Sequence, residues 1–287
     1  MRAVPPDFRS AVQETGLSAA AHLDTETQDE SAGHSVPYVL TTLHAKSMHF
    51  SFAAIQSRMD LVRPELLALD YTRTMMGFLL LQSRPAAIAM IGLGGGSLAR
   101  FIHRYLPETY LKVVEINPEV LGLRTEFLIP DDGDRFRVRL GDGADFVRLP
   151  PRPFDVLLVD GFDAGGQPPE LASQRFYEDC AAALQPDGVA VFNLCPIYRG
   201  YELQLHDLQL AFDGHLLIVP ERDFSNTVVF ASRSPLDQLY ATHGWRGLTS
   251  LPLDARRNLM KSMVRVSKGL MQAGAGPLDA SSLAPAP

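Results

Sequence analysis

Residues 88–116 read IAMIGLGGGSLARFIHRYLPETYLKVVEI. Ile88–Gly92 is a short, continuous apolar run, which is typical of a strand buried on both faces. A glycine-rich turn then leads into a helical stretch at Ser97–Leu106, and Leu111–Ile116 predicts a second strand. A strand, a helix and a second strand in this order predict a parallel sheet that is covered by helices.

The same alternation continues along the chain. We expect further strands, the last two forming an antiparallel pair, at Phe136–Leu140, Phe154–Val159, Val189–Leu194, His215–Val219 and Thr227–Ala231. We expect the accompanying helices at Pro64–Leu81, from Pro118 onward, and at Gly143–Leu149, Glu170–Leu184 and Gly200–Phe212. Strands separated by helices predict an α/β fold with a doubly wound, mostly parallel sheet.

The two ends of the chain differ in composition from its middle. Residues 1–36 are scattered polar residues without a sustained period and residues 271–287 are of low complexity, so we expect flexible tails. Alternation between Tyr38 and Asp60 predicts two or three short antiparallel strands. We therefore assign a small β-hairpin region to 37–63 and a Rossmann-like domain to 64–270.

The basic stretch Arg256–Arg265 predicts a solvated helical face.

Composition excludes several classes of protein. The chain has 287 residues, a net charge of −7 and no run of basic residues, which argues against a nucleic-acid partner. Its two cysteines provide neither a disulfide framework nor a thiolate metal site, so we expect no metal. No apolar run is long enough to span a membrane, and the first residues lack the apolar core of a signal peptide. We expect a cytoplasmic protein.

The ends of the predicted strands carry glycine and acidic residues, and ligands of open α/β sheets bind at this edge. After the first strand, glycines at positions 92, 94, 95 and 96 allow the backbone to approach a ligand closely. Ser97 replaces the third glycine of the dinucleotide fingerprint, which favours a nucleoside without pyrophosphate.

Acidic residues follow the next three strands. Glu115 ends the second strand and is placed to accept both hydroxyls of a ribose. Asp142, before Gly143, either accepts a hydrogen bond from an adenine amine or caps the following helix. Asp160 and Asp163 follow the fourth strand, and two carboxylates at this spacing can hold or deprotonate a cationic amine.

These motifs, with Gln56 and Tyr71 upstream, resemble those of the polyamine aminopropyltransferases, the spermidine/spermine synthase family. The resemblance runs from about Tyr38 to Phe230. It implies an N-terminal β-hairpin domain on a methyltransferase-like Rossmann domain, and a homodimer. It also implies transfer of an aminopropyl group from decarboxylated S-adenosylmethionine, a co-substrate that is not permanently bound, to a small cationic di- or polyamine, with release of methylthioadenosine.

The resemblance assigns roles residue by residue. Asp160 becomes the catalytic residue that holds or deprotonates the attacking nitrogen, Tyr71 orients that nitrogen, and Asp163 binds the substrate. Gln167, with Pro168 and Pro169, falls in the loop that covers the site in the family. The implied nucleoside-binding residues are Gln56, Gly92, Gly94, Gly95, Gly96, Glu115, Asp142 and Gly143.

Three positions depart from the family pattern. Gly95 stands where the family has the aspartate that binds the donor's amine, Thr72 replaces a glutamine, and the loop after Val159 lacks the Ser-Ser and Pro of the family. The nucleoside half of the site is thus kept while the amine half is altered. Two other functions remain open: an S-adenosylmethionine-dependent methyltransferase for small molecules, and a nucleoside-binding protein without turnover.

Overall fold

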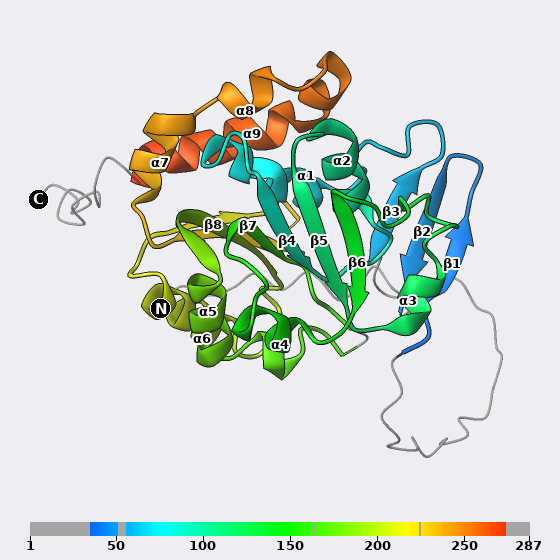
Figure 1. Cartoon of the computed structure of the whole chain (residues 1–287), viewed down its shortest axis with the longest axis horizontal. Helices are drawn as coiled ribbons and strands as arrows, with labels where there is room; N and C mark the ends of the chain where they lie inside the picture. Colours follow the sequence, from blue (N-terminus) through cyan, green and yellow to red (C-terminus); the bar gives the residue numbers. More distant parts are fainter. Residues whose placement is uncertain (1–34, 51–55, 164, 224, 274–287) are drawn as a thin grey trace, which may run out of the picture. The chain divides into compact units, whose positions relative to one another are not determined.

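The stretch that predicts the fold forms a strand, a helix and a second strand. In the computed structural model, which describes residues 35–50, 56–163, 165–223 and 225–273, these are β4 (Ala87–Ile91), α2 (Ser97–Tyr105) and β5 (Tyr110–Glu115) (Figure 1). All five residues of β4 are buried, because β4 lies inside the sheet and helices cover both of its faces. The predicted tails fall almost entirely outside the described residues.

The central sheet has seven strands in the order β6-β5-β4-β7-β8-β10-β9. Its remaining strands are β6 (Phe136–Leu140), β7 (Phe154–Val159), β8 (Leu184–Leu194), β9 (Leu216–Pro220) and β10 (Thr227–Ser232). All neighbouring pairs from β6 to β8 are parallel, whereas β10 runs antiparallel to both β8 and β9. The predicted doubly wound, mostly parallel sheet is therefore confirmed, and its strand order reverses between β4 and β7, where such sheets bind ligands.

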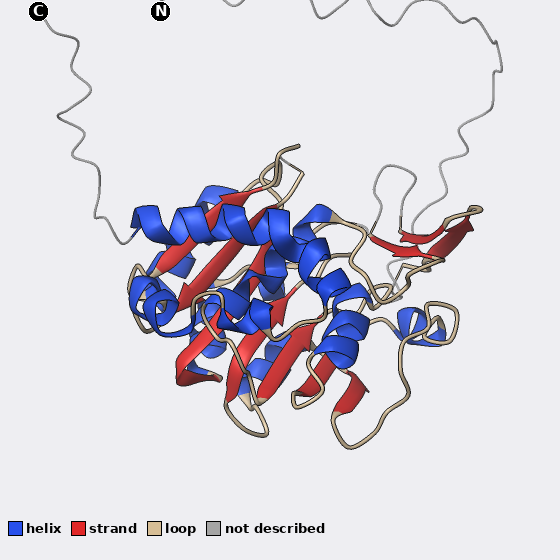
Figure 2. Cartoon of the chain, turned by 90° about the horizontal axis from the view of Figure 1, so that it is seen from above, coloured by secondary structure: helices blue, strands red, loops and turns tan. Residues whose placement is uncertain are grey.

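Helices cover the sheet on both faces (Figure 2). They are α1 (Asp70–Met75), α3 (Pro118–Gly122), α4 (Gly143–Arg148), α5 (Gln174–Ala182), α6 (Tyr201–Ala211), α7 (Leu236–His243), α8 (Arg246–Thr249) and α9 (Leu253–Ala273), with α2 and the 3-10 turns η1 (Met76–Leu80) and η2 (Pro169–Leu171). Among the described residues, no helix is long and apolar enough to cross a membrane.

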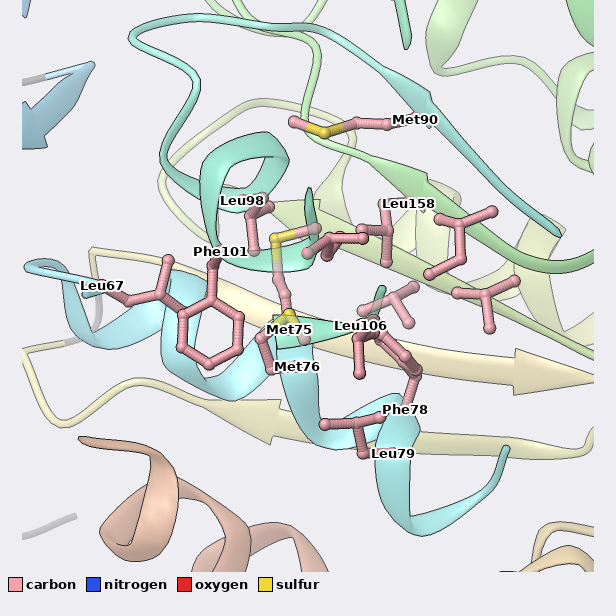
Figure 3. Close-up of a cluster of buried hydrophobic side chains, with 14 of the residues drawn as sticks. Leu67, Met75, Met76, Phe78, Leu79, Met90, Leu98, Phe101, Leu106 and Leu158 are labelled. Atoms are coloured by element: carbon pink, nitrogen blue, oxygen red, sulfur yellow. The ribbon is translucent and has the colours of Figure 1, made fainter. Parts of the chain in front are cut away.

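Alternate residues of the strands supply two apolar clusters. Ile88 and Met90 of β4 pack under α1, α2 and α9, whereas Ala89 and Ile91 face α4, α5 and α6. The cluster on the first face contains Met75, Met76, Phe78 and Phe101 (Figure 3), all of them without exposed surface. This period of two within one strand is what a sheet buried on both faces requires.

A small antiparallel sheet precedes the large one. It consists of β1 (Tyr38–Thr41), β2 (Ala45–His49) and β3 (Ser57–Asp60), as the alternation between residues 38 and 60 predicts. An ion pair of 3.1 Å joins Lys46 to Glu126, and the hydroxyl of Ser57 lies 3.3 Å from that of Ser97. The first contact attaches the small sheet to the segment that follows residues 118–122, and the second attaches it to the start of α2.

The helix predicted at Pro64–Leu81 is wrong in its first part, since α1 begins only at Asp70. Tertiary contacts occupy the backbone groups that a longer helix would use. The amide of Asn258, in α9, bonds both the N–H and the carbonyl of Leu67, each at 3.1 Å. Arg100 bonds the carbonyl of Pro64 at 3.0 Å.

The helix predicted at Glu170–Leu184 and the strand predicted at Val189–Leu194 also begin or end at other residues than expected. Helix α5 begins only after Ser173, whose hydroxyl caps it by accepting from the N–H of Phe176 at 3.2 Å. Strand β8 already begins at Leu184, which pairs with Phe154, and a bulge shifts the register before Val189. The residues expected to end the helix, 185–188, therefore lie within an irregular strand.

Candidate active site

The glycine loop between β4 and α2 has a backbone that only glycine adopts readily. Gly92, Gly94 and Gly96 have φ angles of +86°, +51° and +65°. A Cβ atom on Gly92 would lie 2.2 Å from the carbonyl oxygen of Asp160, so the loop packs directly against the end of β7. The loop thus brings backbone to the switch point of the sheet without side chains in the way.

Position 95 has no room for a side chain in this packing. A Cβ on Gly95 would lie 2.5 Å from Oγ of Ser57 and 3.0 Å from Cδ1 of Phe127. The Ser57 hydroxyl is itself buried beside the Ser97 hydroxyl. Ser57 of the small sheet and Phe127 therefore occupy the space that a side chain at position 95 would enter.

Glu115 ends β5 and is 7% exposed. Its Oε2 accepts from the N–H of Leu93 at 2.8 Å, and its Oε1 accepts from the N–H of Asn117 at 2.9 Å. Each carboxylate oxygen can accept two hydrogen bonds, so both keep an acceptor site for a ligand. The bond to Leu93 fixes the carboxylate against the glycine loop.

Asp142 caps α4, one of the two roles that its position predicts. Its Oδ1 accepts from the N–H groups of Ala144 at 2.6 Å and Asp145 at 3.2 Å. Within the described residues, Oδ1 accepts both hydrogen bonds of this carboxylate. Asp142 can therefore cap α4 through Oδ1 and contact a ligand through Oδ2. A Cβ on Gly143 would lie 2.4 Å from Cγ2 of Ile91, which shows how closely α4 begins against β4.

Asp160 follows β7 and accepts hydrogen bonds from β8 and α1. Its Oδ1 accepts from the side-chain amide of Asn193, in β8, at 2.8 Å. Its Oδ2 accepts from the phenol hydroxyl of Tyr71, in α1, at 3.2 Å. That hydroxyl also lies 3.4 Å from the carbonyl oxygen of Gln56, just before β3. Tyr71 therefore links Gln56 to Asp160, two residues that the resemblance places in the same site.

The surroundings shift the protonation of this pair. Burial raises the pKa of Asp160, the hydrogen bonds from Asn193 and Tyr71 oppose that rise, and the charge of Glu115 adds to it. Burial also raises the pKa of Tyr71, and the nearby Asp160 carboxylate raises it further. The phenol therefore stays protonated near neutral pH, and the carboxylate binds a proton more readily than an ordinary aspartate.

Asp163 and Gln167 lie in the loop after β7. Oδ1 of Asp163, which is exposed, accepts from the N–H of Gly165 at 2.7 Å. The amide of Gln167 donates to the carbonyl of Leu171 at 3.0 Å and accepts from Gln204 at 2.9 Å. In the described part of the chain, neither side chain is hydrogen-bonded to Asp160.

Asn193 is the residue that sequence reasoning missed. It is 3% exposed, and its Oδ1 is buried without a hydrogen-bond partner among the described residues. It stands in the apolar run VAVFNL, at positions 189–194, and belongs to no recognisable motif. The sequence does show a lone amide near the end of a buried strand. Because parallel strands end at the same edge of the sheet, this position alone would have placed Asn193 at the ligand-binding edge.

In the described residues, no group of three or more His, Cys, Asp or Glu side chains lies close enough together to hold a metal ion.

The strand order, the glycine loop and the acidic strand ends define the class of methyltransferase-like Rossmann proteins. Two of the solved structures that are similar to this chain illustrate the fold. A probable spermidine synthase from Corynebacterium glutamicum has a TM-score of 0.60 and 19% identity, over 74% of this chain and 84% of that one. Human methyltransferase-like protein 13, solved in complex with SAH, has a TM-score of 0.53 and 24% identity, over 71% and 93%.

Sequence comparison identifies the family. The model of the spermine/spermidine synthase domain matches residues 69–203, which include Tyr71, Glu115 and Asp160. The polyamine aminopropyltransferase of Chromobacterium violaceum is 42% identical over 189 residues, which is 66% of this chain and 72% of that protein. The chain belongs to the polyamine aminopropyltransferase family, the spermidine synthase family of transferases.

Proposed function

We propose that this chain transfers the aminopropyl group of decarboxylated S-adenosylmethionine to a small di- or polyamine and releases methylthioadenosine. The observation that carries the proposal is the bond between Tyr71 and Asp160 at the end of β7, directly against Gly92. A proton acceptor and an orienting hydroxyl thus lie beside the loop where a nucleoside donor would bind.

The nucleoside would bind along the ends of β4, β5 and β6. The carboxylate of Glu115 would accept the two ribose hydroxyls, since its recorded bonds leave an acceptor site on each oxygen. Oδ2 of Asp142 would accept from the adenine amine while Oδ1 caps α4. The positive φ angles of the glycine loop support close approach of the donor, and Gln56, whose carbonyl accepts from Tyr71, and Gly143 would border the same site.

The amine must lose a proton as it attacks. An alkylamine with a pKa near 10 is neutral in only about one molecule in a thousand at pH 7. The nitrogen forms a bond to the propyl carbon, the carbon–sulfur bond breaks with its electrons going to sulfur, and Asp160 takes the proton from nitrogen. The raised pKa of Asp160 suits that step, and Tyr71 would orient the nitrogen. Asp163 would bind the remote ammonium, with Gln167 in the covering loop.

The organisation of the protein is proposed with its function. We propose a catalytic domain at 64–270, a β-hairpin region at 37–63, and a homodimer that acts in the cytoplasm on a small amine rather than on nucleic acid or membrane. The net charge of −7 supports a cationic substrate. No resident cofactor or metal takes part in the proposed reaction.

One observation favours a second function, methyl transfer from S-adenosylmethionine. Without a carboxylate at position 95, the carboxylate of that donor would meet no like charge, and Ser57 fills the space instead. Against it stands the family to which the chain belongs.

Product analysis separates the two functions. The purified protein is incubated with either donor and with putrescine, cadaverine, diaminopropane or spermidine, and the products are identified by mass spectrometry. Methylthioadenosine with an aminopropylated amine supports our proposal. S-adenosylhomocysteine with a methylated amine supports the second function, and nucleoside binding without any product indicates a protein without turnover.

A further inference from the structure

Helix α1 carries a second polar contact on the face that carries Tyr71. Thr74 follows Tyr71 by three residues, so the two side chains lie on the same side of the helix. The hydroxyl of Thr74, which has no exposed surface, donates to Oε1 of Glu221 at 2.6 Å. Arg265 of α9 donates to the same Thr74 oxygen. The helix is therefore fixed by Tyr71 at one point and by Thr74 at another.

Glu221, which is buried, and Arg265, which is partly buried, form an ion pair at this second point. Nη2 of Arg265 lies 2.6 Å from Oε1 of Glu221, and the Glu221 side chain is 3% exposed. Burying a charged pair is costly unless its geometry is good and its remaining polar groups are bonded. Here Oε2 of Glu221 and Nε of Arg265 have no hydrogen-bond partner among the described residues. Arg265 and Thr74 therefore both donate to the same atom, Oε1 of Glu221. We call Thr74, Glu221 and Arg265 the anchor cluster.

Sheet topology puts the anchor cluster at the same edge as Asp160. Strands β8 and β9 are both antiparallel to β10, so they run in the same direction. Thr227 pairs with Leu194 on one side and with Pro220 on the other, so Glu221 follows β9 at the level where β8 ends. Asn193, which bonds Asp160, is the residue before Leu194.

Helix α1 depends on such contacts for its position. It has six residues, and a helix of that length is not stable by itself in water. It packs on β8, β10 and α9, and its N-cap residue, Leu69, makes no side-chain cap bond. Tertiary contacts therefore decide where the Tyr71 side chain lies.

We propose that the ion pair between Glu221 and Arg265, acting through the hydroxyl of Thr74, positions Tyr71 against Asp160. These three residues are positioning residues, and none of them touches the reacting atoms. The inference rests on the proposed function for the roles of Tyr71 and Asp160. A displacement of about 1 Å can lower a rate on the order of a hundredfold, so the anchor has a kinetic consequence.

The test compares Thr74→Val, which removes the hydroxyl, with Thr74→Ser, which keeps it. Arg265→Lys serves as a second variant if Thr74→Val folds poorly, and Arg257→Met, on the exposed side of α9, is the matched control. In protein labelled with ¹³C at tyrosine Cζ, the chain's eight tyrosines give few resonances, and loss of one in Tyr71→Phe assigns Tyr71. Binding of methylthioadenosine is measured by calorimetry, and kcat by product formation.

We expect Thr74→Val to shift the Tyr71 resonance and to lower kcat roughly ten- to a hundredfold, with nucleoside affinity within about twofold of wild type. Thr74→Ser should restore both the resonance and most of kcat, and Arg257→Met should change neither. An unmoved resonance and an unchanged kcat in both Thr74→Val and Arg265→Lys would overturn the inference, as would an equal loss of nucleoside affinity. The resonance reports the position of Tyr71 whichever group the enzyme transfers, so failure of the proposed reaction is distinguishable from failure of this inference.

Discussion

Replacement of Asp160 by asparagine removes the proposed proton acceptor with little change of shape. The side chain now accepts from Asn193 at 2.8 Å and from Tyr71 at 3.2 Å. The asparagine oxygen can keep the bond to Asn193, while its NH₂ group faces the Tyr71 oxygen, which can accept as well as donate. The backbone bond from residue 160 to the carbonyl of Ile91 is unaffected. The substitution therefore tests chemistry rather than folding.

The expected loss of activity has two parts. A positioned general base contributes about a hundred- to ten-thousandfold to a rate, and asparagine cannot take up the proton. A hydrogen bond to a charged group contributes about 1.5–3 kcal/mol, so loss of the carboxylate would also weaken amine binding roughly ten- to a hundredfold. We expect kcat of Asp160→Asn to fall at least about a hundredfold.

The stability of the same variant should change in the opposite direction. The pKa of Asp160 in the folded protein lies above its ordinary value of 3.8, mainly because of burial. Between those two values the folded state binds more protons than the unfolded chain, so the stability contributed by this group falls as pH rises. Asparagine carries no such penalty. Relative to wild type, Asp160→Asn should therefore gain stability as pH rises above 3.8.

The assay is steady-state product formation together with urea unfolding at several pH values. Asp163→Asn is the matched control, because the same change three residues along should raise the amine KM with little effect on kcat. Full turnover in Asp160→Asn with unchanged methylthioadenosine binding would refute the assignment of Asp160. Loss of the folded state at neutral pH would refute the stability argument.

Three further substitutions test the rest of the site. Tyr71→Phe removes a bond that lowers the pKa of Asp160, so the acid limb of the kcat/KM profile should move to higher pH; an unmoved limb would contradict this. Gly92→Ala puts a Cβ 2.2 Å from the Asp160 oxygen at a φ of +86°, and should lower the free energy of unfolding by at least about 1–3 kcal/mol in urea. Glu115→Gln should weaken methylthioadenosine binding roughly ten- to a hundredfold by calorimetry, whereas unchanged affinity would remove Glu115 from the ribose site.

The parts of the fold that were predictable are those with a local signal. Strands β6 and β7 begin and end as predicted. In β6, FRVRL, apolar and basic residues alternate up to Gly141, and in β7, FDVLLV, the apolar run ends at Asp160. The start of α1 was not predictable, because the amide that occupies the backbone of Leu67 comes from Asn258, 191 residues away. The early start of β8 is equally non-local, since it follows from pairing of Leu184 with Phe154.

The candidate site divides in the same way. The glycine loop and the acidic residues at the strand ends follow from position alone, and the resemblance adds Gln56 and Tyr71. Asn193 and the anchor cluster were not predictable, because their partners lie 33 or more residues away and no motif marks them. Arg265 was expected on a solvated face, yet its side chain is 26% exposed and paired with Glu221. The role of a single polar residue such as Asn193 can be assigned only when the fold shows which residues it contacts.

Competition between the two donors in one reaction tests aminopropyl transfer by this chain most sharply. Decarboxylated S-adenosylmethionine and S-adenosylmethionine are supplied at equal concentration with putrescine, and the two nucleoside products are quantified by mass spectrometry. Methylthioadenosine should predominate, and Asp160→Asn should abolish most of it. Predominance of S-adenosylhomocysteine with methylated amine would refute aminopropyl transfer and would identify Gly95, with Ser57 beside it, as the mark of a methyltransferase.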